Sequence, residues 1–157
     1  MLTLCRLWDP PGMDRPAGCR HISVWIRRPA DEVYRFAADP RNLPLWAAGL
    51  AQAELTRTGE VWVAQSPMGQ VSVRFTPAND LGVLDHTVTL TNGERVFNPL
   101  RVLPAGAERD CAWSEMVFDL RRRPGMSDAD YDADAEAVAA DLAALKQLME
   151  NPGLRNV

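Results

Sequence analysis

The chain has 157 residues, 46% of them hydrophobic and 24% charged, which is the make-up of an ordinary globular domain. This length fits a single domain, and the net charge of −4 argues against nucleic-acid binding, which requires a basic face. Three cysteines without a CxxC pair, and the lack of an apolar run of roughly 20 residues, predict a cytoplasmic protein with no disulfide framework, no metal and no membrane span.

Residues 1–18 are polar and broken by proline and glycine, so we expect a flexible tail that is not a signal peptide. Met13 is a second candidate for the natural start, because the patterned chain begins only after it. Apolar residues then alternate over 21–28, which predicts a first strand. Pro29 opens a short helix, and a second short helix follows Asp39 and Pro40.

Alternating patterns predict about six further antiparallel strands, at 50–57, 60–65, 69–76, 84–90, 94–103 and 108–121. Asn92-Gly93 predicts a tight hairpin turn between two of them, because both residues tolerate the positive φ of such turns. Pairing about this turn brings residue 86 close to residue 98 or 99.

The clearest element is a long helix from Ser127 to about Asn151. Ser127 and Asp130 resemble a capping box, and acidic residues crowd the N-terminal half, where the helix dipole favours them. The apolar residues recur at helical spacing and form one stripe: Tyr131, Ala135, Val138, Leu142, Leu145 and Met149. Residues 152–157 are a short tail, so the predicted single domain covers 19–151.

Three segments resemble the START-like (SRPBCC) superfamily and, in part, its polyketide-cyclase/dehydrase-like bacterial subgroup. They are PADEVYRFAADPRNLPLW, GVLDHTVTLTNGERVFNPLRVLP and RRPGMSDADYDADAEAVAADLAALKQLME. The resemblance implies an α+β helix-grip fold, in which a curved antiparallel sheet of six or seven strands wraps the C-terminal helix. It also implies a cavity between sheet and helix that takes hydrophobic ligands, but no invariant catalytic set, because chemistry varies across the fold.

His86 is the most interesting single residue, because alternation puts it on one face with apolar neighbours. It would be a buried histidine satisfied by a neighbour, a contact for a ligand, or an acid or base. Asn98 lies near it across the predicted turn. The two side chains would form a polar spot that orients a ligand, or a cross-strand pair that fixes the register.

Several large apolar side chains would line the cavity or fill the core, and their spacing alone does not separate the two roles. The candidates for ligand contact, besides His86 and Asn98, are Trp46, Phe75, Met116, Phe118 and Leu142.

Charged and aromatic residues outside this set have mostly structural interpretations. Asp85 and Arg101 are expected to face outward as an ion pair or in solvent. The arginines at 121–123 would pair with Asp128, Asp130 or Asp132, or would hold an anionic head group at the cavity mouth. Three tryptophans are expected on the outer faces of strands, where they would form a dimer interface: Trp25, Trp62 and Trp113.

Three functions therefore remain open. The first is binding of a small hydrophobic molecule, aromatic, polyketide-like or lipid-like, without a cofactor. The second is an enzyme of the cyclase, aromatase or dehydratase type that uses His86 as its acid or base. The third is a protein–protein interaction module built on the outer tryptophans.

Overall fold

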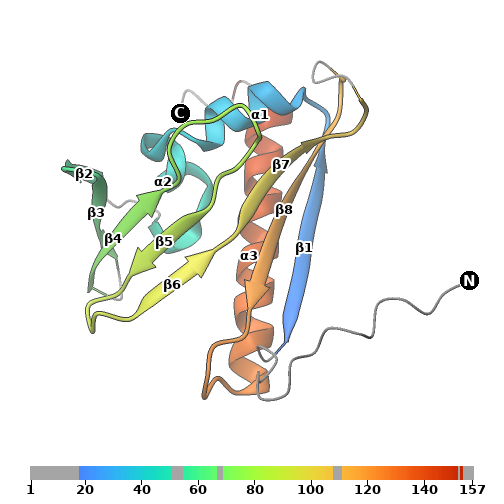
Figure 1. Cartoon of the computed structure of the whole chain (residues 1–157). Coiled ribbons are helices and arrows are strands. Elements are labelled where there is room, and N and C mark those ends of the chain that lie inside the picture. The colour runs from blue at the N-terminus through green and yellow to red at the C-terminus, as the bar shows by residue number, and fades with distance from the viewer. Residues whose placement is uncertain (1–17, 51–54, 67–68, 108–110, 152, 154–157) are drawn as a thin grey trace, which may run out of the picture.

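The computed structural model describes residues 18–50, 55–66, 69–107, 111–151 and 153. The elements come in the predicted order of strand, short helices, antiparallel strands and long helix (Figure 1). Their bounds are β1 Cys19–Ile26, α1 Ala30–Ala37, α2 Leu43–Trp46, β2 Leu55–Thr58, β3 Val61–Ser66, β4 Gly69–Phe75, β5 His86–Thr89, β6 Arg95–Asn98, β7 Leu100–Pro104, β8 Ser114–Arg121 and α3 Asp128–Glu150. Two 3-10 turns, Pro40–Asn42 and Ala48–Leu50, flank α2.

The strands form two antiparallel ladders, one in the order β2-β3-β4-β5-β6 and one in the order β1-β8-β7. The sequence predicts one strand over 94–103, but the structure divides it into β6 and β7 at Pro99. Proline has no N–H to donate to a ladder, so pairing stops there and the chain bends from one sheet into the other. The predicted fold class is confirmed, with the strands divided between two sheets at this break.

The turn between β5 and β6 differs slightly from the predicted two-residue turn. Thr89 pairs with Arg95, and the Leu90 N–H donates to the Glu94 carbonyl, so three residues, 91–93, form the loop. Gly93 closes the loop with φ of +83°, in the left-handed region that glycine adopts at little cost. This register places His86 directly opposite Asn98.

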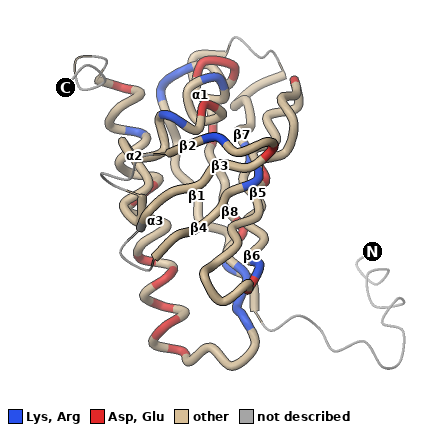
Figure 2. The backbone as a smooth tube through the Cα atoms, turned by 90° about the vertical axis from the view of Figure 1, so that its left-hand side faces the viewer, with Lys and Arg blue, Asp and Glu red and all other residues tan. Residues whose placement is uncertain are grey.

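Helix α3 runs the length of the β1-β8-β7 sheet and packs mainly against β1 and α2 (Figure 1). The Ser127 hydroxyl caps it by accepting from the Asp130 N–H at 3.1 Å, as the sequence predicts. The Tyr131 hydroxyl donates to the Leu120 carbonyl at one end, and Lys146 donates to the Trp25 carbonyl at the other. Acidic residues line the N-terminal half of the helix (Figure 2).

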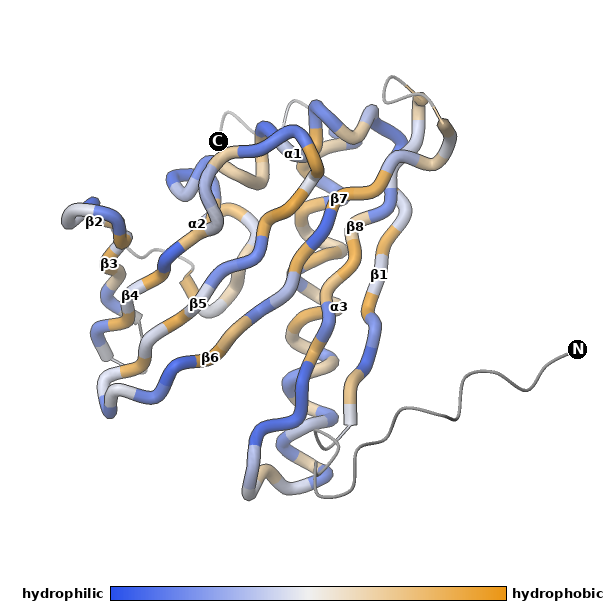
Figure 3. Tube along the Cα trace, in the orientation of Figure 1, coloured by the Kyte–Doolittle hydropathy of each residue, from blue (hydrophilic) through white to orange (hydrophobic). Residues whose placement is uncertain are grey.

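The core lies between α3, the short helices and the inner faces of the strands. Hydrophobic and hydrophilic residues alternate along β1 and β8, so one face of this sheet turns to the helix (Figure 3). Most of the predicted α3 stripe is buried, and Leu148 joins it. The fully buried large side chains include Ile26, Met116, Leu142, Leu145 and Met149.

The predicted tails lie outside the described residues, apart from Gly18 and Gly153. Among the helices that the structure describes, none combines the length and the apolar character needed to cross a bilayer.

Candidate functional site

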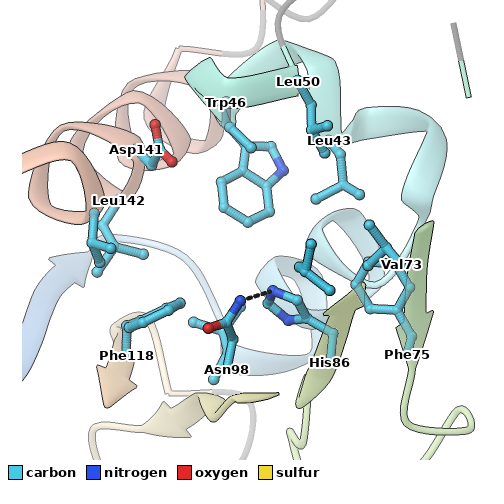
Figure 4. Close-up of a pocket in the computed structure, with 14 residues that line it drawn as sticks. Leu43, Trp46, Leu50, Val73, Phe75, His86, Asn98, Phe118, Asp141 and Leu142 are labelled. Atoms are coloured by element: carbon cyan, nitrogen blue, oxygen red, sulfur yellow. Dashed lines mark hydrogen bonds between the residues drawn. The ribbon is translucent and has the colours of Figure 1, made fainter. Parts of the chain in front are cut away.

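A cavity of about 190 Å³ lies where the β2–β6 sheet curves away from α3. Helix α2 and the 3-10 turn after it close one side, strands β4 to β6 form the floor, and α3 closes the other side (Figure 4). Six of the seven predicted ligand-contact residues line it: Trp46, Phe75, His86, Asn98, Phe118 and Leu142. Most of the remaining lining is aliphatic, from Leu43, Leu50, Val73, Val88, Leu100 and Val138.

The seventh predicted contact, Met116, does not line the cavity. It is fully buried in the core cluster, between Val24 and Val102 in the neighbouring strands. Met116 shares its face of β8 with Phe118, but two residues along a strand are roughly 6.6 Å, which is enough to leave the cavity wall.

His86 and Asn98 form the predicted polar pair in this apolar wall. The His86 Nδ1 lies 3.1 Å from the Leu84 carbonyl oxygen, and the Asn98 amide nitrogen lies 3.3 Å from His86 Nε2. A carbonyl only accepts, so Nδ1 carries the proton and Nε2 accepts from the Asn98 amide. Both nitrogens of the neutral ring are thus engaged within the protein.

Burial reinforces this neutral state. Desolvation lowers the pKa of His86 below its ordinary 6.5, and this effect outweighs the hydrogen bond to Leu84, which raises it. The ring also packs against Phe75, with centroids 5.4 Å apart. His86 therefore serves best as a fixed anchor that orients the Asn98 amide.

The Asn98 side chain still has hydrogen-bonding capacity toward the cavity. Its Nδ2 has a second hydrogen, and its Oδ1 has two lone pairs and lies on the side of Phe118 (Figure 4). Trp46 adds a further polar atom to the wall. Its indole N–H is buried and, among the described residues, has no hydrogen-bond partner.

Asp141 is the cavity residue that the sequence reasoning missed. Its carboxylate accepts from the Ala48 N–H at 2.9 Å and so ties α3 to the 3-10 turn that closes the cavity. Burial raises its pKa from the ordinary 3.8, against the opposing effect of the Ala48 hydrogen bond. The signal was present in the sequence, because Asp141 directly precedes Leu142 and is three residues after Val138, which puts a carboxylate at the edge of the apolar stripe.

Asp141→Asn should stabilise the fold at neutral pH. A folded-state pKa above 3.8 means that ionisation opposes folding, so this residue's contribution to stability falls as pH rises past 3.8. The amide oxygen of asparagine can still accept from Ala48. We expect a higher melting temperature than wild type at pH 7 and a gap that closes as pH approaches 3.8. A lower melting temperature at pH 7 would show that the charged carboxylate is needed.

A groove of about 290 Å³ continues from the cavity along the N-terminal half of α3. The groove adds Leu90, Val96 and two arginines to the lining. The two spaces share five lining residues, which are Val88, Asn98, Phe118, Val138 and Asp141. A ligand longer than the cavity would extend into this groove.

Solved structures of similar shape place this arrangement among known folds. XoxI from Bacillus cereus is 18% identical, with a TM-score of 0.63 over 86% of this chain and 97% of its own. A START superfamily protein from Mycobacterium smegmatis is 12% identical, with a TM-score of 0.63 over 85% of this chain and 98% of its own. The di-domain ARO/CYC protein BexL is 19% identical, with a TM-score of 0.60 over 86% of this chain and 48% of its own.

The fold is START-like. No protein-family model matches the sequence, and no curated protein sequence matches it either. At these identities the solved structures establish the fold and its helix grip, while the chemistry of the cavity has to be argued from its own residues.

Two of the three arginines at 121–123 form ion pairs with acidic residues. Arg122 contacts Asp128 at 2.6 Å, as one predicted pairing has it, and Arg123 contacts Glu94 at 3.2 Å. Asp132 pairs instead with Arg20. Of the three arginines only Arg121 and Arg123 line the groove.

The Asp85–Arg101 ion pair is confirmed, but Asp85 is less exposed than predicted. Its side chain retains 14% exposure, and its carboxylate also accepts from the Leu100 N–H at 2.9 Å. That contact stabilises the chain just after Pro99, where the sheet bends.

The predicted outer patch of three tryptophans is only partly present. Trp25 and Trp113 are 49% and 43% exposed at the β1-β8-β7 sheet, near exposed Leu103. Trp62 pairs in register with buried Val73 and so lies on the inner face of the other sheet, contrary to the prediction. The alternation in β3 is apolar on both faces, which left its inward face undetermined from the sequence.

Proposed function

We propose that this START-like domain binds a small aromatic molecule with one hydroxyl group, in the cavity between strands β4–β6 and helix α3. The observation that carries the proposal is an apolar cavity with one fixed polar pair, His86 and Asn98, in its wall. Apolar walls provide affinity by excluding water, and a few placed polar atoms determine the ligand's orientation.

The cavity volume limits the ligand's size. An engineered cavity of roughly 150 Å³ binds benzene, so about 190 Å³ suits one aromatic ring with one or two substituents. A multi-ring polyketide or a lipid would have to occupy the groove as well. This favours the small aromatic ligand among the hydrophobic classes that the sequence leaves open.

The polar pair indicates where the hydroxyl would lie. His86 takes one amide hydrogen of Asn98, which fixes the amide plane and leaves Oδ1 to accept from a ligand. A phenol hydroxyl that donates to Oδ1 would replace a hydrogen bond that the ligand makes in water. The matching hydrocarbon has no hydroxyl and cannot make this hydrogen bond, so the polar pair should favour the phenol over the hydrocarbon.

The test compares para-cresol with toluene by calorimetric titration. Wild-type protein should bind para-cresol about tenfold more tightly, as expected for one net hydrogen bond in a buried site. Asn98→Val should remove that preference while toluene affinity changes little. Thr87→Val, on the neighbouring strand β5, is the matched control, because Thr87 lines neither the cavity nor the groove, and this variant should keep the preference. If Asn98→Val preserves the preference, the pair does not orient the ligand.

A second candidate function, catalysis on the bound molecule, is favoured by Asp141 more than by His86. Its carboxyl lines the cavity, and its raised pKa is a property of groups that deliver protons. His86 has both nitrogens engaged. The similarity in fold to the ARO/CYC protein BexL is compatible with a reaction of the cyclase type. Once a turnover assay exists, Asp141→Asn should abolish activity without loss of fold if this candidate is correct.

The interaction-module alternative rests on the two exposed tryptophans of the β1-β8-β7 sheet. It is independent of the cavity. Trp25→Ser with measurement of mass in solution tests it, and an unchanged mass would remove its support.

A further inference from the structure

Three potential metal-ligand side chains meet on the outer face of the β1-β8-β7 sheet, the side away from the cavity. They are the thiol of Cys19, the imidazole of His21 and the carboxylate of Asp119. One donor atom from each lies within 4.8 Å of the others, and His21 Nδ1 is 2.5 Å from Asp119 Oδ1.

The register of the sheet brings them together. Cys19 and His21 are two residues apart on β1, so both side chains point to the same face. His21 pairs directly with Asp119 on β8. The inner face of the same stretch carries Ile22, which packs against the core, so β1 is held firmly beneath the cluster.

An ordinary cross-strand ion pair would explain His21 and Asp119 alone. Such an ion pair does not account for the Cys19 thiol, whose sulfur lies within 4.8 Å of a donor atom of each of the other two side chains. Zinc bonds of about 2.0–2.3 Å in tetrahedral geometry place ligand atoms about 3.4 Å apart. The three side chains would have to rotate to reach that spacing, and the exposure of Cys19 and His21 and the partial exposure of Asp119 leave room for this.

Two neighbouring arginines bear on whether a cation can enter. Arg20 points to the other face, where it pairs with Asp132 and lies over the Tyr131 ring. Arg121 is the strand partner of Cys19 and shares its face, but its guanidinium lies over the Phe97 ring, 5.6 Å from the centroid. The positive charges beside the cluster are therefore drawn away from the three donors.

We propose that Cys19, His21 and Asp119 bind a transition-metal ion of the zinc class. The mixture of sulfur, nitrogen and oxygen donors suits zinc or cobalt, whereas calcium and magnesium require oxygen ligands. Three protein ligands leave a fourth position for water, which is the arrangement of exchangeable or catalytic sites more than of closed structural ones. This site shares no residue with the cavity, so it does not depend on the proposed ligand.

The test is cobalt titration of the reduced, metal-free full-length protein, followed by displacement with zinc. We expect one equivalent of Co²⁺ to produce a thiolate charge-transfer absorption and the visible bands of tetrahedral cobalt, both lost on adding Zn²⁺. Cys19→Ser should remove the charge-transfer absorption. His21→Ala and Asp119→Asn should each weaken zinc binding by about 100-fold, measured against a chromophoric chelator.

Cys111→Ser is the matched control, since Cys111 is the other described cysteine and precedes β8, whereas Cys19 pairs with Arg121 at the far end of that strand. It should leave both the absorption and the affinity unchanged. Circular dichroism of each variant should match wild type, because Cys19 and His21 are exposed and Asp119 is partly exposed. Failure to bind one equivalent of Co²⁺, or a charge-transfer absorption that persists in Cys19→Ser, would overturn the proposal. So would zinc affinity that is unchanged in His21→Ala.

Discussion

Val88→Trp is expected to lower para-cresol affinity by more than about 100-fold, because the indole would occupy the space that the ligand needs. Val88 is on β5, lines the cavity beside His86 and is only half-buried, so the larger ring can extend into empty volume. Aromatic residues are well tolerated in strands, and the melting temperature should change little. Calorimetric titration and thermal unfolding measure the two effects.

Thr87→Trp provides the control for this substitution. Thr87 is the preceding residue of β5 and does not line the cavity, since alternate residues of a strand face opposite sides. The same increase in bulk there should leave affinity within about twofold of wild type. Equal losses in the two variants would mean that the ligand does not occupy this cavity.

Leu145→Ala should have the largest effect on stability, a loss of about 2–5 kcal/mol in the free energy of unfolding. Leu145 is completely buried on α3 and belongs to the core cluster, but it does not line the cavity. Truncation would leave a void where the helix packs onto the sheet. Urea denaturation gives the value directly.

The matched control for this loss is Leu81→Ala, at a leucine that is 68% exposed. Leu81→Ala should change the free energy of unfolding by no more than about 0.5 kcal/mol. A loss below 1 kcal/mol in Leu145→Ala would contradict the packing of α3 onto the sheet.

Local patterns were sufficient to predict the elements that carry their own signals. The α3 helix is capped by Ser127 and Asn151, the residues at which the sequence predicts it to begin and end, because a capping residue and an apolar stripe at helical spacing mark it in the sequence. The Asn92-Gly93 turn likewise placed His86 beside Asn98, within one residue of the observed register.

Features that depend on three-dimensional packing were not predictable in the same way. Alternation continues through Pro99, so the sequence pattern predicted one strand where the missing N–H ends one sheet and begins another. Met116 and Phe118 look equivalent in β8, and only the position of the cavity along the strand separates core from wall.

The cluster of Cys19, His21 and Asp119 also depends on packing in three dimensions and could not be predicted from local patterns. The sequence suggested no metal site, because the three cysteines and two histidines are scattered along the chain. Asp119 comes next to His21 only through the pairing of β1 with β8, which joins residues about 100 positions apart. Asp141 was different, since its position at the edge of the apolar stripe, beside Leu142, was visible in the sequence.

The most direct test of the proposed function is the indole N–H resonance of Trp46 in ¹H–¹⁵N spectra, assigned with Trp46→Phe, during titration with para-cresol. Trp46 lines the cavity, whereas Trp25 and Trp113 are exposed on the other sheet and serve as internal references. Binding in the cavity predicts a saturable shift of the Trp46 resonance while those two stay in place. A Trp46 resonance that does not move while either reference does would contradict the proposal.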